Sequence, residues 1–137
     1  MMQIRFIPEG ERFSPEGIAD RWLETFASAV PADKRAALIN CSGDYLWQIL
    51  FCPEISCLTG IAARTAYDEE SIAQVLFFEA HKRDHDGYSV HDLVLAAKAS
   101  LGSAAVNAYA DAFVIAPDFS WTYVHTHEGD DFFCRRP

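Results

Sequence analysis

The sequence lacks the long apolar segments that mark membrane proteins and secreted precursors. No apolar run approaches the roughly 20 residues that a bilayer-spanning helix needs. The first residues, MMQIRFIPEG, have no lysine or arginine ahead of a long apolar core, so they do not resemble a secretory signal. These absences predict a soluble, cytoplasmic protein without a membrane partner.

Glycine and cysteine are scarce, and neither forms a catalytic or metal-binding motif. The seven glycines form no phosphate-binding loop and no Gly-x-Ser-x-Gly nucleophile elbow. The four cysteines form no Cys-x-x-Cys pair, and Cys52 and Cys134 lie among large apolar residues. The spacing favours buried free thiols for Cys41, Cys52, Cys57 and Cys134 rather than a disulfide or metal framework. Cys41, in the turn-like NCSGD, is a weak candidate for a reactive thiolate because no positive charge is near it in sequence.

Positive charge is also in short supply. Lysine and arginine total 11 against 20 aspartates and glutamates, which gives a formal net charge of -9 at pH 7. Proteins bind phosphate backbones by neutralising them with basic side chains, so this balance argues against direct binding to nucleic acid or to an anionic membrane. The same charge would attract a basic protein and accelerate its association.

Hydrophobic residues, in contrast, are abundant. They make up 50% of the chain, and aromatic residues make up 13%. A chain of 137 residues is expected to form one domain, here 1–137. At that size, folding buries roughly two-thirds of the surface of the unfolded chain. The composition therefore predicts a single globular domain with a substantial aromatic core.

Hydrophobic periodicity predicts strands and helices in alternation. Alternating or continuous apolar runs predict strands at MQIRFI (2–7), YLWQILFC (45–52), SIAQVLFFEAH (71–81), AYADAFVIA (108–116) and SWTYVHTH (120–127), with a short strand or turn at CLTG (57–60). Helical spacing predicts helices over 14–30, 32–39, 61–71 and 91–101. The fold class is thus α+β, or α/β, with a single mixed sheet of about five strands and about four helices packed on it. Residues 111–127 are expected to form a C-terminal β-hairpin.

The stretch DFSWTYVHTHEGDD, residues 118–131, carries the strongest functional pattern. If the strand continues through His127, alternation places His125 and His127 on one face, about 7 Å apart at their Cα atoms. Such a pair can bind zinc or iron, with Glu128, Asp130 or Asp131 as a third ligand. A hydrogen-bonded histidine pair beside an acidic loop is the favoured interpretation, since no second cluster has ligand spacing. No cofactor is therefore expected, and zinc or iron is the alternative.

A second polar cluster, HKRDHDG, occupies residues 81–87 after a predicted central strand. His81 and His85 would complete a four-histidine site with the C-terminal histidines if the two strand ends were neighbours. The favoured interpretation is a solvated turn, for which Asp86 and Gly87 provide the geometry.

Aromatic residues raise a third question. Tyr45, Trp47 and Trp121 would mark a recognition surface if they were exposed, because aromatic residues are enriched at interface hot spots. The alternative is that they fill the core, which is the favoured interpretation for Trp47.

Three segments resemble one known family. The strand YLWQILFC, the segment CLTGIAARTAYDEE and the ending DFSWTYVHTHEGDDFF are similar to the uncharacterised bacterial family called domain of unknown function 4275, over residues 45–133. The family pattern has Leu-Trp-His in the strand, and Gln48 stands here in place of that histidine. The terminal FCRRP also departs from it. The resemblance implies no activity, so it indicates how the chain is organised but not what the protein does.

The leading hypothesis is that the protein is a small acidic immunity protein that neutralises a basic toxin such as a nuclease. Loop carboxylates would pair with lysine or arginine in the toxin while an aromatic side chain anchors the contact; the expected contact residues are Trp121, Tyr123, Glu128, Asp130, Asp131, Asp84 and Asp86. One alternative is a small metal-dependent enzyme that uses His125 and His127. Another is a structural or regulatory subunit that forms a homodimer through an exposed apolar face.

Overall fold

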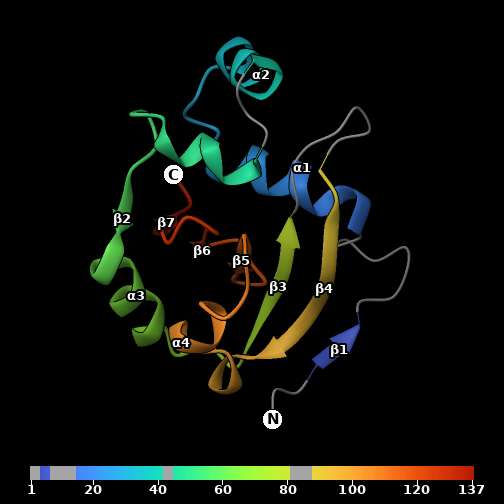
Figure 1. The fold of residues 1–137 in the computed structure, drawn as a ribbon, viewed down its shortest axis with the longest axis vertical. Helices are drawn as coiled ribbons and strands as arrows, with labels where there is room; N and C mark the ends of the chain where they lie inside the picture. The colour runs from blue at the N-terminus through green and yellow to red at the C-terminus, as the bar shows by residue number, and fades with distance from the viewer. Residues whose placement is uncertain (1–3, 7–14, 42–44, 81–87) are drawn as a thin grey trace.

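The computed structural model describes residues 4–6, 15–41, 45–80 and 88–137, which form an α+β fold around one antiparallel sheet (Figure 1). The described residues contribute seven strands in the order β1-β4-β3-β5-β6-β7-β2. Their bounds are β1 Ile4–Phe6, β2 Cys57–Thr59, β3 Gln74–Ala80, β4 Val90–Ala97, β5 Ala112–Ile115, β6 Trp121–His125 and β7 Asp131–Arg135. Each pair of neighbouring strands is antiparallel, so the expected mixed sheet is corrected to an antiparallel one.

Helical segments accompany both faces of this sheet. They are α1 Pro15–Phe26, α2 Ala32–Cys41, the 3-10 helix η1 Leu46–Phe51, α3 Gly60–Glu69, the 3-10 helix η2 Lys98–Ser100 and α4 Ser103–Val106. One core cluster joins buried residues of α1 and η1 to the sheet, and a second joins those of α3 and α4 to it. The two faces are called here the η1 side and the α3 side. Figure 1 shows β1 and β2 at opposite margins of the fold.

The predictions for α1, α2, α3, β1, β3 and the β5–β6 hairpin are confirmed. Helix α1 illustrates why: Ile18, Trp22 and Phe26 recur at helical spacing and are all buried. The short strand β1 lies at one edge of the sheet, as its alternating pattern indicates. For α1 the single apolar face was sufficient, whereas β3, β5 and β6 were recognised from runs of aromatic and β-branched residues, since both of their faces are buried.

The predicted strand over 45–52 is wrong, since residues Leu46–Phe51 form the 3-10 helix η1. Four of its residues are buried, and they recur at helical spacing: Leu46, Trp47, Ile49 and Leu50. The Gln48 side chain accepts a hydrogen bond from the backbone N–H of Tyr45 at 2.9 Å, which satisfies a donor at the start of the helix. An apolar run of this length suits a buried helical turn as well as a buried strand, so sequence could not separate the two.

The predicted helix over 91–101 is also wrong, because Val90–Ala97 forms strand β4 between β1 and β3. Its apolar residues alternate between the faces: Leu93 and Leu95 pack with the η1-side cluster, and Val94 and Ala96 with the α3-side cluster. With both faces covered, the strand has no polar face to reveal a period of two. Pairing on both edges therefore overrides the local helical pattern.

Strand β7 was not predicted, and it changes the meaning of the acidic loop. Residues 126–130 form a tight connection between β6 and β7, in which Thr126 N–H donates to Asp130 O at 2.9 Å and Gly129 N–H donates to Thr126 O at 3.0 Å. Gly129 has a φ of 88°, a conformation that favours glycine. The residues expected to form an acidic rim are thus a hairpin turn and the start of a core strand.

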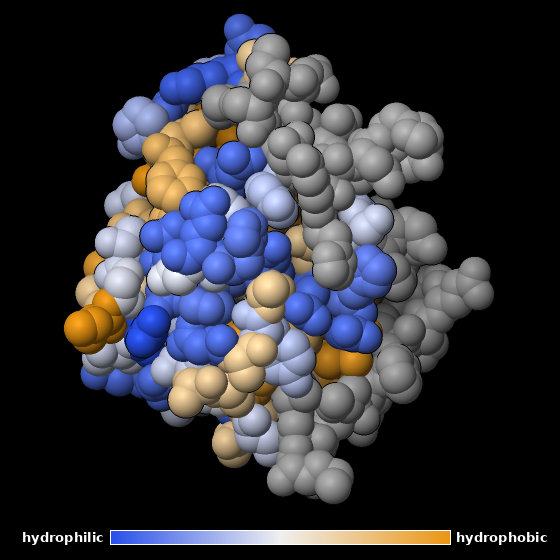
Figure 2. Space-filling model, in the orientation of Figure 1, coloured by the Kyte–Doolittle hydropathy of each residue, from blue (hydrophilic) through white to orange (hydrophobic). Residues whose placement is uncertain are grey.

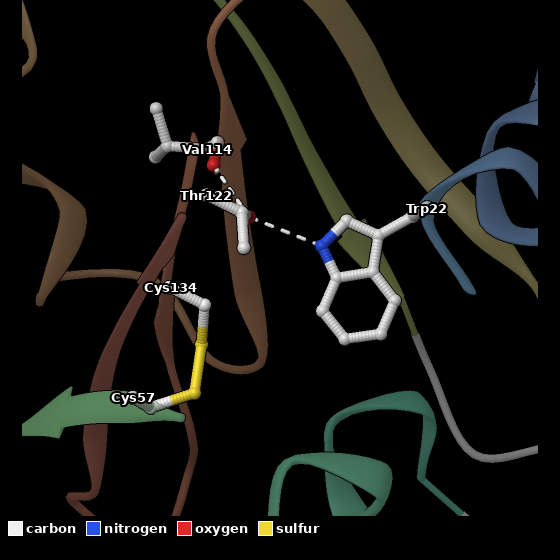
Figure 3. The surroundings of a disulfide bond; sticks show 5 residues. All are labelled: Trp22, Cys57, Val114, Thr122 and Cys134. Carbon is white, nitrogen blue, oxygen red and sulfur yellow. Dashed lines mark hydrogen bonds between the residues drawn. A yellow bond between two sulfur atoms is a disulfide. The ribbon is translucent and has the colours of Figure 1, made fainter. Parts of the chain in front are cut away.

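The prediction of free thiols is wrong for two cysteines, because Cys57 and Cys134 form a disulfide. The antiparallel register places them opposite each other on β2 and β7, although they are 77 residues apart in sequence (Figure 3). Cys52 is a buried free thiol as expected, and burial raises its pKa. The side chain of Cys41 lies outside the described residues.

Helices long and apolar enough to cross a membrane are absent from the described parts of the chain.

Candidate functional site at one end of the sheet

Polar residues that are far apart in sequence meet at one end of the sheet. Across the strands, Glu79 pairs with Ala112, Ala112 with His125, and His125 with Asp131. The last residue of β3, Ala80, donates its backbone N–H to the carbonyl of Asp111 at 3.2 Å. The end of β6 and the start of β7 therefore lie beside the end of β3 and the start of β5. This end of the sheet holds two polar networks, one on each side.

On the η1 side, the network is centred on the carboxylate of Asp111. Its Oδ1 accepts hydrogen bonds from Trp47 Nε1 at 2.8 Å and from the backbone N–H of His127 at 3.0 Å. The same oxygen lies 2.9 Å from Nδ1 of His127. Asp111 has a φ of 49°, in the left-handed region that aspartate tolerates better than most residues. This backbone conformation places a nearly buried carboxylate where it fixes both aromatic side chains.

Aromatic rings extend this network along η1. We define the aromatic strip as Tyr45, Trp47, Phe51, His127 and Phe132. The His127 ring centroid lies 4.9 Å from Tyr45 and 5.9 Å from Trp47, and the Phe51 ring lies 5.9 Å from Trp47 and 5.2 Å from Phe132. Trp47 and Phe132 are buried, whereas 57% of Phe51 is exposed. The strip thus has a buried base and an exposed edge.

Two acidic residues of the β6–β7 turn, Glu128 and Asp130, follow His127 of the strip. Glu128 is 60% exposed, and its carboxylate lies 3.9 Å from Nε2 of His127. Asp130 is half-buried in the β6–β7 turn, where its backbone N–H donates to Thr126 Oγ1 at 3.1 Å. A solvent-exposed carboxylate therefore lies at the His127 end of the strip.

On the α3 side, the network is centred on Asp131, which is buried rather than part of an acidic rim. Its Oδ1 lies 2.5 Å from Nδ1 of His125, and its Oδ2 accepts a hydrogen bond from Nε of Arg64 on α3. This ion pair raises the pKa of Arg64, mainly through the hydrogen bond to Asp131. Asp131 joins β7, β6 and α3 in one contact.

The expectation that His125 and His127 share a face is not met. His125 contacts Asp131 on the α3 side, and His127 contacts Asp111 and Trp47 on the η1 side. Strand β6 ends at His125, so the alternation that would place both side chains together does not continue to His127. Among the described residues, no three His, Cys, Asp or Glu side chains are grouped so that they could hold a metal ion.

One protein-family model matches this sequence. It is the family described as Domain of unknown function (DUF4275), and it matches residues 9–134. The chain belongs to this family. No curated protein and no solved structure matches it. The family match confirms the resemblance predicted from residues 45–133 and extends it toward the N-terminus.

The remaining predicted contact residues of this DUF4275 protein are buried or lie outside the described part of the chain. Trp121 and Tyr123 belong to the α3-side core, where Trp121 stacks on Phe133 at 5.5 Å and Tyr123 on Tyr67 at 4.5 Å. Neither side chain reaches the surface as a partner anchor would have to. His81, Asp84, His85 and Asp86 lie outside the described residues.

Sequence reasoning missed three contributors to the site: Arg64, Phe51 and Asp111. Asp111 left one weak signal, since it is a lone acidic residue at the start of the apolar strand AFVI. No sequence signal pointed to Arg64 or Phe51. The residues that they contact here, Asp131 and Phe132, lie 67 and 81 residues further along the DUF4275 chain.

Proposed function

We propose that this protein binds a basic protein partner, in the manner of an immunity protein that neutralises a cationic toxin such as a nuclease. The observation that carries the proposal is the aromatic strip with Glu128 beside it. A surface that carries an exposed aromatic ring and an exposed carboxylate suits a basic partner, whose lysine and arginine side chains gain cation–π contacts at the ring and an ion pair at the carboxylate.

The contacts proposed here differ from those expected on sequence alone. Phe51 and Tyr45 take the anchoring role, because Trp121 and Tyr123 are buried. Asp131 is committed to an internal ion pair, which leaves Glu128 as the exposed acid of the β6–β7 turn. The hypothesis of a basic partner is unchanged, but the proposed anchoring residues are now those at and beside η1 instead of those on β6.

The negative charge that supports this proposal is spread over several elements and does not form one patch, so it would act on a partner at long range. Exposed carboxylates occur on α1, at Asp20 and Glu24, and on α3, at Asp68 and Glu69. Figure 2 likewise shows hydrophilic residues over much of the face in view, with small apolar areas among them. A net charge of -9 distributed in this way would steer a basic partner toward the protein. Orientation then depends on the aromatic strip.

The proposal is tested with the product of the gene immediately upstream of this one, because immunity genes commonly follow their toxin genes. We expect the two purified proteins to bind at about 50 mM salt and more weakly at about 500 mM, where charge steering is screened. Phe51→Ala should weaken binding about tenfold or more, as expected for a hot-spot aromatic side chain. Glu128→Gln should mainly slow association.

Glu69→Gln is the matched control, since it removes the same charge from an exposed position on the opposite side of the sheet. It should slow association less than Glu128→Gln does and leave the dissociation rate unchanged. Absence of binding at low salt would reject the proposed partner class. Binding that ignores Phe51→Ala would reject the proposed surface.

A further inference from the structure

A second cluster on the α3 side has a chemistry that the proposed function does not use. The carboxylate of Asp131 holds two basic side chains at once, Arg64 through Oδ2 and His125 through Oδ1. Only 1% of the Asp131 side chain is exposed, whereas 45% of Arg64 and 12% of His125 are exposed. The Asp131 carboxylate thus lies at the buried bottom of the cluster, and the Arg64 and His125 side chains retain contact with solvent.

The nitrogens that Asp131 does not occupy belong to groups suited to anion recognition. Arg64 uses Nε for Asp131 and also interacts with Tyr123, and 45% of its side chain is exposed; His125 uses Nδ1 for Asp131, which leaves Nε2 on the other side of the ring. Guanidinium N–H groups bind carboxylate and phosphate oxygens with charge-assisted hydrogen bonds. Because one carboxylate contacts both side chains, the guanidinium of Arg64 and the imidazole of His125 lie on either side of Asp131.

The charges of the cluster balance. Arg64 is permanently positive, and Asp131 cancels that charge, so an oxyanion would be recognised by the hydrogen-bond donors of the exposed guanidinium rather than by a net positive charge.

We propose that Arg64 and His125 form a binding site for a small oxyanion, a phosphate or carboxylate group, with Asp131 as the positioning residue. The competing explanation is that the ion pair only fastens α3 to the sheet. The same helix offers a comparison, because Glu70, next to its C-terminal end, pairs with Arg135 of β7 at 2.9 Å and no imidazole takes part in that pair. An anion site should exist at Arg64 and not at Arg135.

The experiment is an NMR titration of the whole protein with sodium phosphate and, separately, with sodium acetate, at an ionic strength held constant with sodium chloride. We expect saturable shifts of the His125 ring resonances and of the Arg64 Nε–Hε resonance. Saturation with phosphate alone assigns the site to phosphoryl groups, and saturation with both assigns it to oxyanions in general. Arg64→Gln should weaken binding at least about tenfold, the effect of losing a charge-assisted hydrogen bond.

Arg135→Gln is the matched control and should leave the affinity unchanged. His125→Gln tests the second donor and should also weaken binding. If either variant at the cluster fails to fold, the wild-type titration decides alone: shifts that stay linear, or that appear equally at Arg135, overturn the proposal. Since no basic partner is present in this experiment, its failure is independent of the proposed function.

Discussion

At the scale of single residues, buried polar groups divide into those with partners and those without. Trp22 Nε1 donates to Thr122 Oγ1 at 3.0 Å, and Thr122 Oγ1 donates to the carbonyl of Val114 at 2.8 Å (Figure 3). Both hydrogen bonds are buried and link α1 to the centre of the sheet. By contrast, the buried hydroxyl of Tyr123 has no hydrogen-bond partner among the described residues.

The first prediction follows from that difference. Thr122→Val should lower the free energy of unfolding by about 1 to 3 kcal/mol, because it leaves the Trp22 N–H buried without an acceptor. Tyr123→Phe is the control: it removes a buried hydroxyl that has no partner, so stability should stay the same or rise. Urea unfolding of the two variants measures both effects. Equal destabilisation by both changes would contradict this account.

The second prediction concerns alkaline pH. Burial raises the pKa of the Tyr67 and Tyr123 hydroxyls well above the ordinary tyrosine value, and nearby negative charge adds to this effect. Below about pH 10 both tyrosines are neutral in the folded and unfolded states, so their contribution to stability is complete. Above that pH the unfolded chain releases protons that the folded chain keeps, and stability must fall.

The expected slope is up to about 1.4 kcal/mol per pH unit for each tyrosine, beginning near pH 10. Unfolding by urea between pH 8 and 11 measures it. Tyr67→Phe, which also removes a hydrogen bond from the hydroxyl to Leu101 O at 2.5 Å, should reduce the slope. An unchanged slope in both phenylalanine variants would show that other groups control the alkaline transition.

At the scale of elements, sequence periodicity identified α1, which has one polar face. Strands β3, β5 and β6 are buried on both faces and were predicted instead from short runs rich in aromatic and β-branched residues between turn signals. Strand β4 was mistaken for a helix and η1 for a strand, because each consists largely of apolar residues covered by the rest of the fold. The missed strand β7 begins with the buried Asp131, whose charge made the segment look like surface.

The third prediction concerns strand β2, which has only three residues and pairs along one edge with β7. Its disulfide closes a loop of 77 residues, for which chain entropy suggests a stabilisation of about 4.5 kcal/mol, although about 2 to 4 kcal/mol is typical. Reduction of the disulfide should therefore lower the free energy of unfolding by about 2 to 4 kcal/mol.

Urea unfolding with and without a dithiol reductant makes this measurement. The double variant Cys57→Ala with Cys134→Ala is the control, because the reductant should not change its stability further. Cys52 remains in that variant as the buried free thiol. A reductant effect that persists there would assign the stabilisation to something other than the Cys57–Cys134 bond.

At the scale of the whole molecule, the dominant property is the net charge of -9. Several carboxylates form ion pairs within the protein. Glu54, for example, pairs with Lys34 at 2.6 Å, and the hydrogen bond between them lowers the pKa of Glu54. The exposed acids on α1 and α3 remain and repel one another through solvent.

The fourth prediction is that sodium chloride stabilises the protein. Raising its concentration from about 10 mM to about 150 mM shortens the range of charge repulsion from about 30 Å to about 8 Å, so the melting temperature should rise. Chloride is preferable to sulfate here, because sulfate also strengthens apolar burial. A charge-reduced variant, Asp20→Asn with Glu24→Gln, should show a smaller rise. A melting temperature that falls with salt would mean that attractive ion pairs outweigh the repulsion.

The homodimer alternative also belongs to this scale and remains a prediction. Leu58 and Ile61, at the edge strand and the start of α3, are 48% and 80% exposed. The molecular mass in solution, measured by sedimentation, would decide whether a second copy covers them.

The sequence by itself determined the acidic charge, the family, the single apolar stripe of α1 and the hairpin of β5 and β6. These properties depend on composition or on residues a few positions apart. Only the tertiary structure decided that Cys57 meets Cys134, that Asp131 is buried between Arg64 and His125, and that the two histidines face opposite sides of the sheet. Each of those outcomes depends on the register of strands from distant parts of the chain, where a shift of one residue would move every side chain of a strand to the opposite face of the sheet.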